Sequence, residues 1–344
     1  MFAGLRSVIS NGWPVRAQET KEVVSIRPDD IYTQHSSDQN PQKLFEKASS
    51  WLTIIQEKRM DQVQTELVLK ETQDTLIRAI FGSNMIERAG LGWDITLNLC
   101  RIVFAGEHVG DIPERTSKYE NQLLDLQYQE GDNESIASQN FHRGRLEIVQ
   151  HARAYQHILH QVVVKQDDLT EDLIKETHRI LTRGIPIVEK GFPDVPPEKY
   201  GGIYRKVPVG AGSTMFTVPQ HVPGKMREMC DKLKADIEKA EKQNSIDPFS
   251  MSSKYSLEFV QIHPFQDGNG RMCRMILNAI LARYAGIIVP IGEKVDEITE
   301  YISIKRRASE SMEGHGEYAM FILKRAVPRL RELKKKLTGK GKSA

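Results

Sequence analysis

The chain has 344 residues, of which 39% are hydrophobic and 27% charged, with a formal net charge of +2. This composition excludes wholesale disorder, collagen and coiled coil, and the length predicts about two domains or one domain with an extension. Three cysteines without a CxxC pair favour a reducing, intracellular compartment. The longest apolar stretch, residues 275–291, is interrupted by Asn278 and Arg283, so no membrane span is expected.

Residues 1–40 are expected to form a disordered leader, because they are mostly polar and regular patterning begins only after them. Residues 1–18 contain no Asp or Glu and include Arg6 and Arg16, which is weakly similar to a mitochondrial presequence. A cytoplasmic or nuclear location is therefore the first expectation, and a mitochondrial one is the alternative.

Apolar residues then recur at helical spacing through an N-terminal helical region, residues 41–130. A polar loop is predicted over residues 129–139. Residues 200–219, rich in Gly, Val and Thr, predict one short hairpin. The remaining predicted helices cover residues 146–162, 173–181, 222–242, 249–262, 270–284, 294–308 and 316–337. We expect a mainly α fold with a single short β-hairpin.

The basic C-terminal tail, residues 324–344, contains nine Lys or Arg and one acid, a net charge of 9 − 1 = +8. The rest of the chain then carries 2 − 8 = −6, which argues against a general nucleic-acid-binding surface. A nuclear address or an anionic docking patch would fit the tail. A solvated helix end, where cations suit the helix dipole, is the preferred interpretation.

One segment, HPFQDGNGRMCR at residues 263–274, carries the chemistry. Gly268, Asn269 and Gly270 open a predicted helix, and their backbone can form a concave nest of N–H groups that suits a phosphate. Asp267 can hold a Mg²⁺ ion that bridges phosphate oxygens.

Two arginines and a histidine complete this segment. Arg271 and Arg274 are three residues apart, so both project over the same region of the helix and can clamp phosphates. His263 can accept a proton at neutral pH. Together these groups indicate phosphoryl or nucleotidyl transfer. The alternative is a purely structural role, a Gly-rich turn with a core histidine and surface arginines. A GNG sequence by itself would favour this alternative, but the complete segment favours chemistry.

The segment resembles the Fic-family signature, His-x-Phe-x-Asp/Glu-Gly-Asn-Gly-Arg-x-x-Arg, and the resemblance extends over about residues 140–310. It implies a Fic catalytic domain at residues 140–320 that transfers AMP from ATP to a Ser, Thr or Tyr hydroxyl of a protein. Kinase-like members replace the second glycine with lysine, whereas Gly270 is retained here. By position, the resemblance implies a base at His263, a Mg²⁺ or Mn²⁺ ligand at Asp267, an anion hole at Gly268, Asn269 and Gly270, phosphate contacts at Arg271 and Arg274, and a target-docking flap that includes Val209, Phe216 and Val218.

A second pattern, SNMIER at residues 83–88, is similar to the inhibitory-helix motif Ser/Thr-x-x-x-Glu-Gly/Asn. Ser83 and Glu87 match, whereas Arg88 stands where Gly or Asn is expected. The resemblance implies that Glu87 pairs with Arg274 and blocks productive ATP binding. Arg88 could compete for that carboxylate or loosen the helix end.

Other functions stay open. A bifunctional enzyme or a predominant de-AMPylase would use Glu87 to position water, and an autoinhibited scaffold would bind nucleotide without catalysis. His151, His157 and His160, near Glu147, have spacings that also allow a zinc site, a weaker hypothesis. Relatives of this class often form homodimers. The sequence identifies neither the target nor the preferred base.

Overall fold

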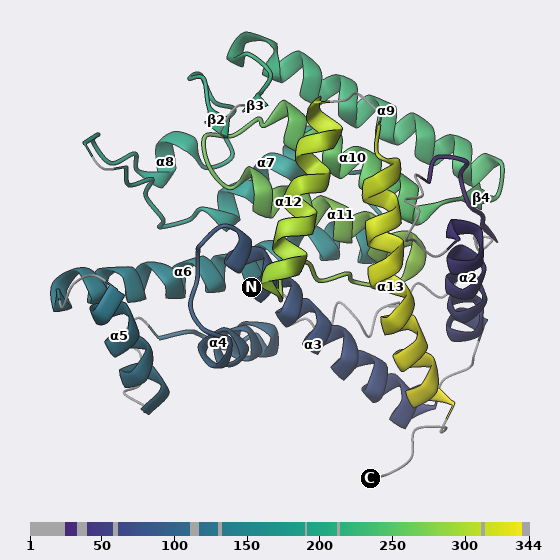
Figure 1. The fold of residues 1–344 in the computed structure, drawn as a ribbon, viewed down its shortest axis with the longest axis horizontal. Coiled ribbons are helices and arrows are strands. Elements are labelled where there is room, and N and C mark those ends of the chain that lie inside the picture. Colours follow the sequence, from purple (N-terminus) through teal and green to yellow (C-terminus); the bar gives the residue numbers. More distant parts are fainter. Residues whose placement is uncertain are drawn as a thin grey trace.

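Helices account for most of the regular structure in the computed structural model, which describes residues 25–32, 40–57, 61–110, 117–129, 133–189, 191–211, 214–310 and 314–338. The prediction of a mainly α fold is confirmed (Figure 1). The elements are β1 (Ser25–Ile26), α2 (Pro41–Glu57), α3 (Gln62–Ile86), α4 (Trp93–Ala105), α5 (Ser117–Gln129), α6 (Glu134–Leu159), a π-helical turn η1 (His160–Val164), α7 (Glu171–Leu181), α8 (Pro197–Tyr200), β2 (Gly210–Ala211), β3 (Thr214–Met215), a 3₁₀ turn η2 (Pro219–His221), α9 (Val222–Lys242), β4 (Ser245–Ile246), α10 (Pro248–Ile262), α11 (Asn269–Ala285), α12 (Val295–Glu310) and α13 (Gly316–Leu337).

The helix α11 lies at the centre of the bundle (Figure 1), and nearly all of its residues are buried. Its apolar side chains contribute to two core clusters. Met275 and Ile276 belong to the cluster formed with α3, α4 and α6, and Leu277 and Leu281 to the one formed with α2, α12 and α13. A helix packed on all sides is held firmly, so residues at its N-terminus have a defined position.

The N-terminal helices share this core with the rest of the chain. Leu76 and Ile80 of α3 pack in the same cluster as Ile148 of α6 and Met275 of α11. The end of α3 is therefore fixed beside the start of α11, although the two segments are far apart in sequence.

The segment over residues 200–219 is less regular than the predicted hairpin. Only β2 and β3 pair, with Gly210 opposite Met215 and Ala211 opposite Thr214. The Arg205 guanidinium bridges the rest of the segment by donating to the carbonyls of Val207 (3.1 Å) and Thr217. Its side chain thus replaces part of a backbone ladder.

The expected disordered leader does not extend over residues 25–32. There β1 pairs in parallel with β4, and the Tyr32 hydroxyl donates to the Asp247 carboxylate at 2.8 Å. Ile26 and Tyr32 also pack against the core cluster of α2 and α13, which offsets the entropy of ordering the segment. The remaining leader residues, 1–24 and 33–39, lie outside the described residues.

The predicted loop over residues 129–139 ends earlier than expected. α6 begins at Glu134 because the Asn133 side chain caps it, accepting a hydrogen bond from the Ile136 N–H at 3.1 Å. Residues 130–132 lie outside the described part of the chain.

The basic tail is helical as far as Leu337. Arg329 pairs with Glu293 at 2.7 Å and Lys336 with Glu71 at 2.6 Å, while Leu330 is buried. Residues 339–344 lie beyond the described residues. None of the helices in the described segments combines the length and hydrophobicity that crossing a bilayer requires.

Candidate active site

The loop between α10 and α11 is bounded by two residues in the left-handed conformation. His263 ends α10 with φ +51°, and Gly268 precedes α11 with φ +79°. The Asn269 side chain closes the loop from inside, since its Oδ1 accepts from the Phe265 N–H (2.9 Å) and its Nδ2 donates to the Phe265 carbonyl (2.8 Å). Any anion-binding role of Asn269 would therefore belong to its backbone.

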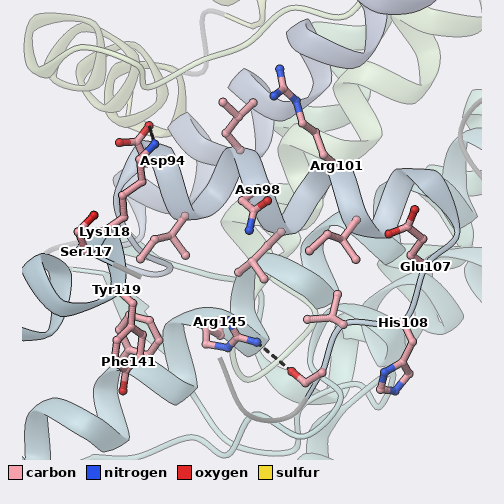
Figure 2. Close-up of a pocket in the computed structure, with 16 residues that line it drawn as sticks. Asp94, Asn98, Arg101, Glu107, His108, Ser117, Lys118, Tyr119, Phe141 and Arg145 are labelled. Atoms are coloured by element: carbon pink, nitrogen blue, oxygen red, sulfur yellow. Dashed lines mark hydrogen bonds and ion pairs between the residues drawn. The ribbon is translucent and has the colours of Figure 1, made fainter. Parts of the chain in front are cut away.

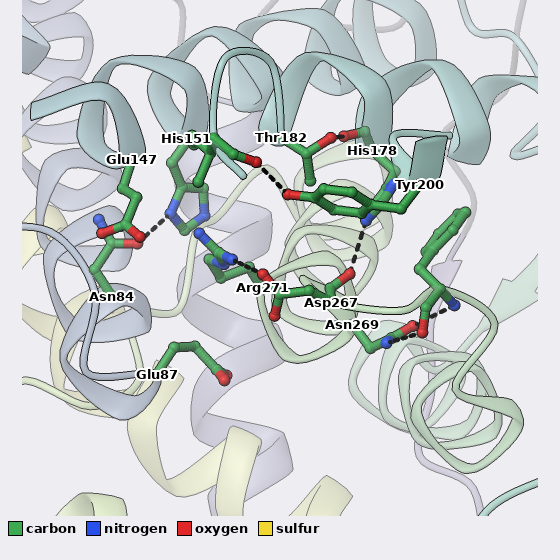
Figure 3. A network of polar contacts seen from close by, with 12 residues as sticks. Asn84, Glu87, Glu147, His151, His178, Thr182, Tyr200, Asp267, Asn269 and Arg271 are labelled. Atoms are coloured by element: carbon green, nitrogen blue, oxygen red, sulfur yellow. Dashed lines mark hydrogen bonds and ion pairs between the residues drawn. The ribbon is translucent and has the colours of Figure 1, made fainter. Parts of the chain in front are cut away.

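A buried histidine from α7, His178, also holds this loop in place. The His178 ring stacks on Phe265 with centroids 3.7 Å apart. Its Nδ1 accepts from the Gly202 N–H at 2.8 Å, so its Nε2–H donates to the Asp267 carbonyl, also at 2.8 Å (Figure 3). Burial lowers the pKa of His178 to about 4, which keeps the ring neutral and this arrangement of protons intact.

His263 is the residue predicted to act as a base. Its Nδ1 lies 3.1 Å from the Val260 carbonyl, so Nδ1 carries the proton and Nε2 has a free lone pair. Nε2 has no hydrogen-bond partner among the described residues. Burial lowers the pKa of His263 to about 4, although the bond to Val260 opposes this effect. The imidazole is therefore a neutral proton acceptor at physiological pH.

Two residues of the segment 200–219 hold this imidazole in place. The Phe216 ring stacks on His263 with centroids 3.8 Å apart, and the Arg205 Nε donates to the His263 carbonyl at 2.6 Å. Of the three predicted flap residues, only Phe216 contacts the histidine in this way. Val209 and Val218 lie in the same segment, and Val218 is exposed.

The Arg271 guanidinium is buried but only partly paired. One amino group donates to the Asp267 carboxylate at 3.1 Å, whereas Nε and Nη1 have no partner among the described residues. Leaving buried charged donors unpaired is costly. An anion that reached them would recover that cost, so Arg271 fits the predicted phosphate contact.

Arg274, three residues further on, has its donors engaged. Its Nε donates to the Ser83 hydroxyl at 2.7 Å, and one amino group donates to the Ser83 carbonyl (3.0 Å) and the Glu87 carboxylate (2.6 Å). The other amino group lies 3.4 Å from the Tyr301 hydroxyl. Ser83 and Glu87, the two residues that match the inhibitory motif, thus hold the arginine to which the resemblance assigns phosphate binding.

The Glu87 carboxylate also covers the start of α11. A β-carbon at Gly270 would lie only 2.1 Å from Glu87 Oε1, so the absence of a side chain at Gly270 lets the carboxylate approach the helix N-terminus. Burial raises the pKa of Glu87, but the charge and hydrogen bond of Arg274, with the charge of Arg271, outweigh it and leave the pKa below its usual value. The group is an anion at the point where a phosphate would be favoured.

Arg88 differs from the Gly or Asn of the inhibitory motif, and its backbone shows why those residues suit the position. Glu87 caps α3, and Arg88 follows with φ +53°, in the left-handed region. Gly and Asn adopt that conformation more readily than residues with a bulkier side chain. No ion pair links Arg88 to Glu87 in the described part of the chain.

We therefore expect Arg88→Gly to raise the free energy of unfolding by about 1 kcal/mol, because it relieves left-handed strain at the end of α3. Arg88→Ala removes the same guanidinium but keeps a β-carbon, and it should leave stability unchanged. Urea denaturation of both variants checks this. Equal stability of the two variants would contradict the strain argument.

The site fits a magnesium-bound triphosphate by the chemistry of its groups. The Asp267 side chain is 41% exposed and so can reach a metal ion. Mg²⁺ in nucleotide sites commonly takes one or two carboxylates, with phosphates and water completing its shell. Arg271 supplies buried, unpaired donors beside that carboxylate.

The zinc hypothesis has no support. The Glu147 carboxylate accepts from the Gly90 N–H (2.7 Å) and from Arg143 (3.0 Å), and His151 bonds to Asn84 at 2.9 Å. No group of three or more His, Cys, Asp or Glu side chains in the described segments is arranged to hold a metal.

Sequence reasoning missed three residues that support the site: His178, Arg205 and Tyr301. Each acts across a distance in sequence, on Asp267, His263 and Arg274 respectively. Of these three, Arg205 alone had a sequence signal. It lies in the Gly-rich segment, and an arginine among small residues can donate hydrogen bonds to nearby backbone carbonyls.

Comparison with known proteins shows which family the chain resembles. Residues 168–281 match the Fic/DOC family. A Fido domain-containing protein of Dictyostelium discoideum is 33% identical over 129 residues, which cover 36% of this chain and 83% of that protein. A protein adenylyltransferase Fic of Nematostella vectensis is 28% identical over 172 residues, covering 49% of this chain but only 34% of that protein.

Solved structures show the same fold. A Fic domain containing signaling protein from Bacteroides thetaiotaomicron aligns with a TM-score of 0.60 at 18% identity, covering 89% of this chain and all of that one. Residues 134–508 of Fic-1 from Caenorhabditis elegans give 0.61 at 16% identity, covering 88% of this chain and 74% of that one. At such identities the likeness concerns the fold alone.

Proposed function

Since the chain belongs to the Fic/DOC family, we propose that it transfers AMP from ATP to a Ser, Thr or Tyr hydroxyl of a target protein and releases pyrophosphate. The observation that carries the proposal is the arrangement of His263 and Arg271 around the loop between α10 and α11. A neutral His263 with a free Nε2 stands at one end of the loop, and Arg271 with two unpaired buried donors stands at the other. A protein that only bound nucleotide would have no use for the free base.

In the proposed reaction the target hydroxyl oxygen attacks the α-phosphorus of ATP. The hydroxyl proton passes to His263 Nε2, the new P–O bond forms, and the bond to the β-phosphate oxygen breaks. Arg271 and the N-terminus of α11 stabilise the charge on the phosphates. When bound at Asp267, Mg²⁺ would neutralise phosphate oxygens.

We further propose that Glu87 inhibits this reaction. Its carboxylate occupies the N-terminus of α11 and engages Arg274, whose other donors are held by Ser83 and Tyr301. With Arg274 engaged in this way, the triphosphate would have Arg271 alone, one of its two proposed arginine contacts. The same carboxylate, one-third exposed beside the proposed anion site, could position water for removal of AMP, which makes de-AMPylation the second candidate.

Incubation of the full chain with ATP, Mg²⁺ and a cell lysate, followed by intact-mass and peptide mass spectrometry, tests these functions. An added AMP on a hydroxyl side chain is the expected result. Loss of AMP from a protein already modified would favour de-AMPylation instead. No change in any protein would leave only a nucleotide-binding scaffold and overturn the proposal.

A further inference from the structure

A positively charged groove, separate from the candidate active site, lies on the opposite side of α6. Glu147 and His151 of α6 face the active site, whereas His142, Leu146, Val149 and Arg153 form a stripe spaced three or four residues apart. At about 100° per residue, this stripe lies roughly on the far face of the helix. It lines a cavity of about 660 Å³, completed by Arg145 of α6, by Arg183 after α7 and by residues 108–110.

The charges of this groove are not balanced. Among the residues that the structure describes, its lining includes Arg145, Arg153 and Arg183 but no Asp or Glu. Arg145 donates to the Gly110 carbonyl at 2.9 Å, and none of the three arginines forms an ion pair with any residue that the structure describes. Burial lowers the pKa of Arg153, and the nearby charge of Arg183 lowers it further, as expected for two cations on one wall of the groove.

The neighbouring cavity provides a contrast. It shares Arg145 and His108 with the groove, but acids are present on its wall (Figure 2). Asp94 pairs with Lys118 at 3.2 Å, and Glu107 lies in the same lining. Uncompensated positive charge is therefore a property of the groove and not of this whole side of the molecule.

A buried amide on the wall of the groove also lacks one partner. Gln150 lines the groove and is only 4% exposed, yet its Oε1 has no hydrogen-bond partner among the described residues. A buried polar group of this kind calls for a partner.

We propose that this groove binds a ligand with clustered phosphate groups, at a site separate from the one that takes ATP. Guanidinium groups pair with phosphate in bidentate fashion, and two adjacent arginines require more than one negative charge to be balanced. The cavity volume is in the range of small-ligand pockets. Either a soluble polyphosphate or the head group of a phosphorylated lipid has the required chemistry.

Calorimetric titration of the full chain with tripolyphosphate tests the proposal. The probe can also enter the active site, so the parent protein carries Arg271→Gln and Arg274→Gln. We expect this parent to bind tripolyphosphate, and addition of Arg153→Gln and Arg183→Gln to weaken binding by at least about tenfold. Arg306→Gln with Arg227→Gln removes two exposed arginines that line neither cavity and should leave binding unchanged.

A second measurement distinguishes the source of the phosphates. Vesicles of phosphatidylcholine, with and without a phosphoinositide, are sedimented with the same proteins. Binding of free tripolyphosphate alone supports a soluble ligand, and binding of phosphoinositide vesicles that depends on Arg153 and Arg183 supports a lipid. The proposal would be overturned if neither tripolyphosphate nor phosphoinositide vesicles bound the parent protein. It would also be overturned if the variant with Arg153→Gln and Arg183→Gln bound as tightly as its parent while its thermal unfolding was unchanged. AMP transfer, measured separately in otherwise wild-type protein, should be unaffected by the groove substitutions.

Discussion

His263→Ala should abolish AMP transfer while ATP binding survives. The imidazole is the only group of the 263–274 loop with a free lone pair suited to take the hydroxyl proton, and a general base contributes about 10²–10⁴-fold to rate. The contacts proposed to hold the triphosphate, at Arg271 and the N-terminus of α11, do not involve this side chain. Transfer of labelled AMP from ATP, together with calorimetric ATP binding, checks both halves of the prediction.

The pH dependence offers a further check on the same residue. Because burial lowers the pKa of His263 to about 4, the ring is deprotonated throughout the neutral range. Protonation of this base should reduce the transfer rate only as the pH falls toward that pKa, well below the value of about 6.5 for an ordinary histidine. A rate that declined around pH 6.5 would indicate an exposed base and contradict the assignment of its environment.

The control is a histidine outside the site. His221 is exposed in η2, and His221→Ala should leave transfer unchanged. Both histidine variants are best compared in a Glu87→Gly background, where the expected activity is high enough to measure a large loss. Retention of transfer by His263→Ala in that background would exclude His263 as the base.

Glu87→Gly should raise auto-modification by labelled ATP, by as much as about a hundredfold if the lost contacts cost productive binding ~3 kcal/mol. The substitution removes the carboxylate from Arg274 and from the start of α11. Arg274 then has a donor free for the outer phosphates. Glu87 follows the last residue of α3, where Gly is well tolerated, so the helix itself should persist.

Another ion pair of α3 supplies the matched control. Glu71 pairs with Lys336 at 2.6 Å, far along the helix from the catalytic loop. Glu71→Gln breaks this pair without touching Arg274 and should leave labelling at the wild-type level. Unchanged or lower labelling by Glu87→Gly would remove the inhibitory role, and a loss of AMP removal alone would assign Glu87 to de-AMPylation.

The candidate site over residues 263–274 could be predicted from sequence because its chemistry is local. His263 and Asp267 lie in the loop between two helices, and Arg271 and Arg274 lie at the start of the second one. Local patterning located both helices to within a residue or two. The flap was harder to predict. Its two-residue strands carry little periodic signal, and Arg205 holds much of the segment through carbonyls that no pattern reveals.

The sequence alone therefore determined the family resemblance, the mainly α fold and the groups available for chemistry. Only the tertiary structure decided which of those groups are free. Arg271 and Arg274 are equivalent in the motif, yet Arg271 has unpaired donors while Arg274 is held by Glu87, 187 residues away. The physical reason is that contacts between distant segments depend on how the helices pack around α11. Periodicity and spacing indicate which face of a helix is buried, but they do not identify the residues of other segments that pack against that face.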